Sequence, residues 1–137
     1  MITNFNIGDC LLWVDIEKTH QFYLTQVKIK DNCQCDDCKF YSEIFIKEPL
    51  EIFLILSSLG VDLQRNLTSE PTGIWCIKDE KNNFLHCNQV YQVVGNFLQC
   101  ERSQLKYEKQ ENNYKVVAIF LNSNSKTIDI DLHIDKV

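Results

Sequence analysis

The segment near the end of the chain alternates strictly between aliphatic and polar residues, and this pattern limits the fold more than any other. The aliphatic members are Ile128, Ile130, Leu132 and Ile134, and the polar members are Asp129, Asp131, His133 and Asp135. Successive side chains of a β-strand point to opposite faces of its sheet. The pattern therefore predicts a strand with one buried face and one face in contact with water.

Several other segments have the composition or the alternation of strands. They are residues 11–16, 22–30, 74–78, 84–87, 90–98 and 116–121. In the second of these, Tyr23, Thr25, Val27 and Ile29 share one face. Turn-forming residues at 79–83 and 122–126 predict hairpin connections. Gly95 within a strand predicts a bulge or a close backbone approach.

Two adjacent helices are predicted in the first half of the chain. The first has apolar residues at one-turn spacing, namely Phe40, Tyr41, Ile44 and Phe45. Asp36 or Asp37 is well placed to cap its first turn. The second covers residues 49–59, with Pro49 in its first turn and Gly60 at its end.

Residues 101–113 are charged and polar and predict a solvated helix or a loop. The chain as a whole predicts an α+β fold, in which a mainly antiparallel sheet of roughly five to seven strands carries the two helices on one face. The 137 residues and the 45% hydrophobic fraction suffice for one domain with its own core, which we expect to span residues 1–137.

The net charge of −5 repels phosphate backbones and anionic lipids, so we expect neither nucleic acid nor a membrane as a partner. The amino-terminal segment lacks the pattern of a signal peptide, and the longest apolar block, residues 50–56, is too short to span a bilayer. These features predict a soluble, cytoplasmic protein. The odd number of cysteines predicts reduced thiols.

Three of the seven cysteines, Cys33, Cys35 and Cys38, fall within six residues. Zinc prefers four tetrahedral thiolate or imidazole ligands, and the spacing between Cys35 and Cys38 lets one turn present two sulfurs to one ion. His86-Cys87 is the best candidate for the missing ligand. The sequence thus offers a zinc site at Cys33, Cys35, Cys38 and Cys87.

Two other interpretations of the cysteine cluster stay open. A C-x-x-C turn between a strand and a helix is typical of thiol oxidoreductases, but Asp36 and Asp37 disfavour a thiolate and two successive helices depart from the βαβ order. Cysteine also packs as a small apolar residue beneath a helix end. The isolated Cys10, Cys76 and Cys100 are expected to be core or near-surface thiols of this kind.

The sequence carries no catalytic motif. Its three histidines accompany no nucleophile elbow, and glycine-rich phosphate-binding motifs are missing, so we expect no enzymatic activity. The polar face of the last strand, formed by Asp129, Asp131, His133 and Asp135, is a candidate docking surface for a basic protein. The alternative is that these charges prevent an edge strand from pairing with another sheet.

Four motifs occur in a characteristic order along the chain. They are C-x-C-x-x-C-K-F-Y at Cys33 to Tyr41, the helix that starts at Pro49 and ends in Leu59-Gly60-Val61-Asp62, the stretch Tyr91-Gln92-Val93-Val94-Gly95, and the closing pair of hydrophobic strands. Together they resemble a family of small uncharacterised bacterial proteins. The resemblance implies no particular activity, and it implies that His86-Cys87 is peculiar to this chain.

Small acidic bacterial proteins without catalytic motifs often bind a partner, and immunity proteins that neutralise a toxin are among them. From the sequence we therefore predict non-catalytic binding of another protein, with inhibition or toxin immunity as its most concrete form. The alternatives are a zinc-binding or zinc-stabilised domain and a thiol oxidoreductase.

Overall fold

The computed structural model describes residues 2–65, 74–81, 83–99, 104–122 and 126–137. Its strands form one antiparallel sheet in the order β1-β2-β4-β7-β6-β5, and β3 pairs with the first part of β4 outside this path. The strands are β1 (Ile2–Ile7), β2 (Cys10–Asp15), β3 (Trp75–Lys78), β4 (Phe84–Gln99), β5 (Gln104–Glu111), β6 (Tyr114–Asn122) and β7 (Thr127–Lys136).

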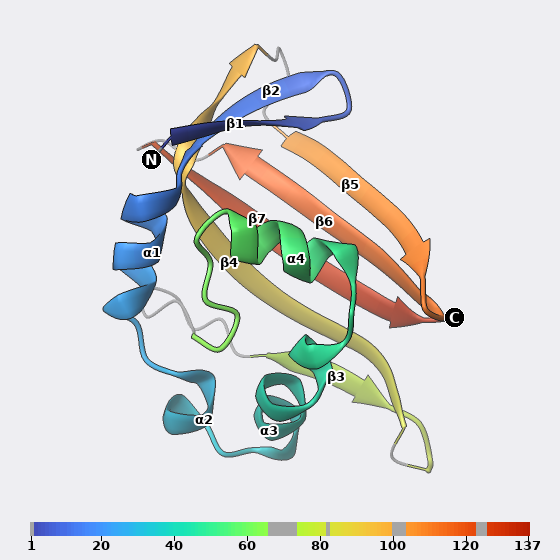
Figure 1. Cartoon of the computed structure of the whole chain (residues 1–137). Helices are drawn as coiled ribbons and strands as arrows, with labels where there is room; N and C mark the ends of the chain where they lie inside the picture. Colours follow the sequence, from blue (N-terminus) through green and yellow to red (C-terminus); the bar gives the residue numbers. More distant parts are fainter. Residues whose placement is uncertain (1, 66–73, 82, 100–103, 123–125) are drawn as a thin grey trace.

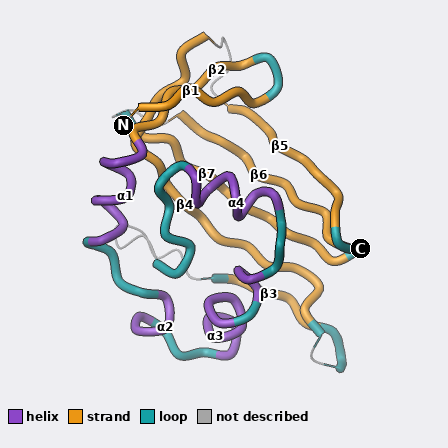
Figure 2. Tube along the Cα trace, viewed as in Figure 1, coloured by secondary structure: helices purple, strands orange, loops and turns teal. Residues whose placement is uncertain are grey.

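The helices gather on one side of this sheet (Figures 1 and 2). They are α1 (Ile16–Leu24), α2 (Ile29–Asn32), α3 (Asp36–Glu43), the 3-10 turn η1 (Phe45–Lys47) and α4 (Glu51–Ser58). An α+β fold with a mainly antiparallel sheet is thus confirmed, although the described residues form four α-helices where two were predicted. Among the described helices, none combines the length and the apolar character that crossing a membrane requires.

The core lies between the helices and the inner face of the sheet. The alternation in β7 is confirmed, because Ile128, Ile130, Leu132 and Ile134 are all at most 2% exposed. The helix predicted over 49–59 is present as α4, and Gly60 closes it with a φ of 96°. Because this backbone conformation is rarely open to other residues, Gly60 fixes the point at which the chain leaves α4.

Strand β4 pairs with three other strands of the sheet. Along one edge it pairs with β7, and along the other it pairs with β3 at its start and with β2 at its end. Between β3 and β2, side chains of α1 form hydrogen bonds with the backbone of β4. Thr19 Oγ1 accepts from the Val94 amide at 2.9 Å. The Tyr23 hydroxyl accepts from the Gln92 amide at 2.8 Å and donates to the Gln92 carbonyl at 2.9 Å. Helix α1 therefore satisfies backbone groups that would otherwise form an open edge.

Gly95 lies where β4 meets β2. A Cβ atom built on it would approach the Trp13 carbonyl oxygen to 2.2 Å, which no real side chain tolerates. The predicted close backbone approach is confirmed, and it brings the end of β4 against β2.

The strand predicted over residues 22–30 is wrong, because this segment holds the end of α1 and the start of α2. The Asp15 carboxylate accepts from the Lys18 amide at 3.0 Å and starts α1 as its N-cap. Thr19 and Tyr23, four residues apart, then face the core, so helical periodicity prevails over the short alternation that begins at Tyr23.

The helix or loop predicted over residues 101–113 is also wrong where the structure describes it, because residues 104–111 form β5. Leu105 and Tyr107 face the core, while Lys106 and Glu108 lie on the outer face and form an ion pair. Two inward residues in a charged segment are a weak signal, and pairing with β6 decides the outcome. The loop predicted over 122–126 falls largely outside the described residues.

A chain of tyrosine hydroxyls ties α3 to the sheet. The Tyr91 hydroxyl on β4 donates to the Leu63 carbonyl at 3.0 Å, and the Tyr41 hydroxyl on α3 lies 2.6 Å from that of Tyr91. Since Tyr91 has one proton and gives it to Leu63, Tyr41 is the donor to Tyr91. Burial raises the pKa of both tyrosines, which keeps both hydroxyls protonated.

We expect Tyr91→Phe to lower the free energy of unfolding by about 2–3 kcal/mol, because it leaves both the Tyr41 hydroxyl and the Leu63 carbonyl buried without a partner. Tyr41→Phe removes only one donor and should cost about 1 kcal/mol. Urea unfolding of the two variants measures the difference. Equal losses in the two variants would contradict the direction of this hydrogen-bond chain.

Candidate functional site

The three clustered cysteines lie where α2 ends and α3 begins. Cys33 follows α2 and donates its amide to the Ile29 carbonyl at 3.0 Å, Cys35 is the N-cap of α3, and Cys38 lies in its first turn. Their three sulfur atoms lie within 4.8 Å of one another. Cys33 and Cys35 are exposed, whereas Cys38 is buried. The site therefore faces solvent on one side and the core on the other.

This separation suits one metal ion. Zinc–thiolate bonds of about 2.3 Å in tetrahedral geometry place two sulfurs about 3.8 Å apart. Sulfurs within 4.8 Å of one another need shifts of only about 0.5 Å each to reach that arrangement. Rotation of exposed cysteine side chains supplies such shifts without moving the backbone.

The thiols of Cys35 and Cys38 differ in electrostatics. The Cys35 sulfur accepts the Cys38 backbone N–H at 3.4 Å, and this bond is the main reason why the pKa of Cys35 falls below its ordinary value. Burial, followed by hydrogen bonds with Cys35 and Cys33, raises the pKa of Cys38. The prediction that Asp36 or Asp37 caps α3 is wrong, because Cys35 is the N-cap. The backbone hydrogen bond lowers the pKa of Cys35 even with these two carboxylates nearby.

Helix α3 is held over the β3–β4 hairpin by contacts along one side. The Phe40 ring stacks on Phe84 with a centroid distance of 3.6 Å and an interplanar angle of 7°. The Asp37 carboxylate lies 3.6 Å from the Lys78 ammonium, which also lies 4.8 Å above the Phe84 ring. Together with the bond from Tyr41 to Tyr91, these contacts fix the direction of the first turn that presents Cys35 and Cys38.

Cys87 is not brought into the cluster. It pairs in register with Cys76 across β3 and β4, and the two sulfurs lie 3.0 Å apart. The hydrogen bond with Cys87, followed by burial, raises the pKa of Cys76. The structure thus unites three of the four cysteines predicted as metal ligands and places the fourth in a separate thiol pair.

Cys10 also differs from its prediction. It is buried as expected for a core residue, but it is disulfide-bonded rather than a free thiol. Cys33, Cys35, Cys38, Cys76 and Cys87 are free. The prediction that the cysteines are reduced therefore fails at Cys10, and Cys100 lies outside the described residues.

The predicted acidic docking surface is on the outer face of the sheet. Its strand, β7, lies between β4 and β6, so the interpretation of these charges as protection of an edge strand is wrong. Each carboxylate has a partner on the sheet: Asp129 accepts from Gln92 at 2.7 Å, Asp131 lies 3.0 Å from His133, and Asp135 lies 2.5 Å from His86. Each of the three carboxylates therefore already contacts a polar side chain of the sheet before any partner arrives.

Comparison of the chain with protein-family models, with curated proteins and with solved structures gives no match. The resemblance to a bacterial family accordingly stays a prediction, and the site has to be interpreted from its own geometry.

We expect iodoacetamide to modify Cys35 first in metal-free protein, because it is exposed and its pKa is lowered. Between pH 8 and pH 6.5 its rate should fall less than the rate of the same cysteine in the denatured chain, since more of it stays thiolate. Cys38 and Cys76, with raised pKa values, should react about tenfold or more slowly. Mass spectrometry of timed samples gives these rates, and one shared pH profile for Cys35 in folded and denatured protein would contradict them.

Proposed function

We propose that this chain is a metal-binding domain that holds one thiophilic cation, preferably zinc, between Cys33, Cys35 and Cys38. The observation that carries the proposal is the convergence of three sulfur atoms within 4.8 Å at one turn. Thiolates select zinc and copper(I) over magnesium or calcium, which take oxygen ligands. Ordinary packing explains the buried Cys38 but gives no reason for Cys33 and Cys35 to be exposed beside it.

The surroundings of the Cys35 sulfur favour its anionic, ligating form, whereas burial raises the pKa of Cys38. Cys35 accepts a backbone N–H at the start of α3, and the positive end of the helix dipole lies at the same turn. Among the described residues, no further histidine, cysteine or carboxylate joins the three sulfurs. On this proposal, solvent or a residue outside the described ranges completes the coordination.

The role that fits such an ion is to join α2 to α3. Helix α2 has four residues and α3 has eight, and helices this short are marginal without tertiary support. A metal bound by Cys33 on one side and by Cys35 and Cys38 on the other would cross-link the two. Any ligand that binds only the folded state raises stability in this way.

Binding of a protein partner, including toxin immunity, stays a prediction beside this proposal. It is supported by the outer face of the sheet, where Val117 and Ile119 are only partly buried and the helices lie on the other side (Figure 1). The internal pairing of Asp129, Asp131 and Asp135 weakens the case for a basic partner. A stoichiometric complex on pull-down would support the prediction, and weakening of that complex by Asp131→Asn would place it on this surface.

We expect protein purified without a histidine tag to carry about one zinc ion per chain by elemental analysis. Cys33→Ser, Cys35→Ser and Cys38→Ser should each weaken binding by about a hundredfold or more, because loss of even an outer-shell partner costs 10–100-fold. Zinc should also raise the melting temperature of the wild type, and a chelator should reverse this.

Cys76→Ser and Cys87→Ser are the matched controls, since both remove a free thiol that lies outside the cluster. Both should keep full zinc occupancy. Loss of zinc in Cys87→Ser would instead indicate that Cys87 is the fourth ligand. Metal far below one equivalent in the wild type, with no effect of chelator on melting, would sink the proposal.

A further inference from the structure

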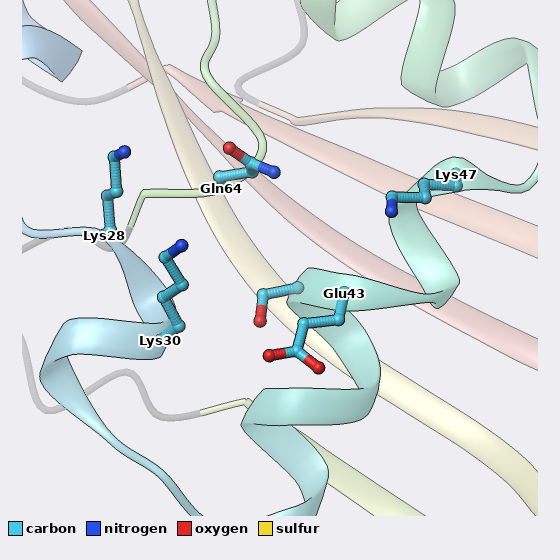
Figure 3. A pocket seen from close by; sticks show the side chains of 6 residues that line it. Lys28, Lys30, Glu43, Lys47 and Gln64 are labelled. Carbon is cyan, nitrogen blue, oxygen red and sulfur yellow. The ribbon is translucent and has the colours of Figure 1, made fainter.

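A small pocket opens at the other end of α3, away from the thiols. It has a volume of about 200 Å³ and is lined by Lys28, Lys30, Ser42, Glu43, Lys47 and Gln64. Figure 3 shows Lys28 and Lys30 on one side of this space and Lys47 on the other, with the Gln64 amide between them and Glu43 below. No part of the thiol cluster lines it.

Backbone pairing assembles the pocket from distant segments. The Ile29 amide donates to the Gln64 carbonyl at 2.7 Å, and Lys28 forms an isolated antiparallel bridge with Arg65. The Arg65 guanidinium in turn donates to the Gln26 carbonyl at 2.7 Å. The chain after α4 is therefore fastened to the start of α2, and this fixes Gln64 relative to Lys28 and Lys30.

The three lysines are distinguished by lying around one cavity while, among the described residues, no carboxylate pairs with any of them. Lys78, Lys106, Lys109 and Lys115 each form an ion pair with a carboxylate. Within the described part of the chain, no ion pair involves Lys28, Lys30 or Lys47. Among the described residues of the wall, Glu43 is the one carboxylate, so the three ammonium groups leave a local excess of two positive charges there.

This local charge opposes the overall charge of −5. At physiological ionic strength, charges are screened over about 8 Å, so the lysines on the wall outweigh the distant carboxylates for a ligand inside the pocket. Lysines that repel one another around a cavity are stabilised by an anion between them. The charge distribution therefore indicates an anionic ligand.

The volume limits the size of that ligand. About 200 Å³ equals the liquid volume of roughly six or seven water molecules, and pockets for drug-sized ligands usually start near 300 Å³. An oxyanion with one central atom fits, together with a few waters. A nucleotide or a peptide does not.

The two acceptors on the wall narrow the chemistry further. The Ser42 hydroxyl already donates its proton to the Cys38 carbonyl at 2.7 Å, so it offers a ligand only its lone pairs. The Glu43 carboxylate is likewise an acceptor. An oxyanion that still carries a proton can donate to one of them, whereas a fully deprotonated oxyanion such as sulfate meets only repulsion there.

We propose that this pocket binds a small protonated oxyanion, of which inorganic phosphate is the simplest. Lys28, Lys30, Lys47 and the Gln64 amide donate to its oxygens, and Glu43 or Ser42 accepts from its P–OH group. The proposal does not depend on the metal site. Phosphate binding and zinc binding can succeed or fail separately.

Isothermal titration of the full chain with inorganic phosphate, against sodium chloride of equal ionic strength, tests the proposal. We expect saturable binding at one site and weaker binding of sulfate by about tenfold, because sulfate has no proton to donate to Glu43 or Ser42; a tenfold change corresponds to about 1.4 kcal/mol. Lys28→Gln, Lys30→Gln and Lys47→Gln should each raise the Kd about fivefold or more.

Lys81→Gln is the matched control, because Lys81 is exposed, lies in the β3–β4 turn and undergoes the same change of charge. It should leave the Kd unchanged. Glu43→Gln should reduce the preference for phosphate over sulfate, because the amide can donate to either anion. Absence of saturable phosphate binding, or an equal loss in Lys81→Gln and the pocket variants, would overturn the site; equal affinity for sulfate and phosphate would overturn the protonated ligand.

Discussion

The position of α3 depends on the buried hydroxyl of Tyr91. It accepts from Tyr41 on α3 and donates to Leu63, in the segment that follows α4, so one polar atom in the core joins three separate parts of the chain. Buried hydroxyls are costly to leave unpaired, so these two hydrogen bonds favour the arrangement in which helix, strand and loop meet at this atom. The position of α3 in turn determines both candidate sites, because the thiols lie at the start of this helix and Glu43 lies at its end.

Strand β4 imposes the second constraint. It has sixteen residues and is longer than β3 or β2, which both pair with the same edge of it. These two strands therefore leave a gap between them along β4. Helix α1 fills the gap with Thr19 and Tyr23, whose hydroxyls replace the missing strand. The chain must then cross from α1 over the hairpin to reach α3. This route carries Lys28 and Lys30 past the end of α3 and places the thiol turn beside β3.

Local patterns in the sequence predict much of this architecture. The alternation in β7, the hairpin of β3 and β4, the helix closed by Gly60 and the cysteine cluster all depend on residues within one element or one turn. The errors arise where tertiary contacts decide. Tyr23 belongs to a segment that alternates like a strand, but it lies in a helix. Leu105 and Tyr107 are too few inward-facing residues to predict β5 from the sequence. The pairing of Cys87 with Cys76 depends on hairpin register, and the lysine pocket gathers residues from segments that carry no shared motif.

The two ends of α3 have opposite electrostatic characters, and this bears on why the lysines are there. A helix dipole favours anions at its start, where Cys35 lies, and cations at its end, but the second effect is worth only about 0.3–1 kcal/mol and fades within one turn. One lysine would satisfy it. Three unpaired lysines around a single cavity exceed what the dipole can stabilise, and their mutual repulsion grows with each one added. On the proposal made above, an anion between them offsets this repulsion, so the ligand, rather than the helix dipole, would account for the arrangement of Lys28, Lys30 and Lys47.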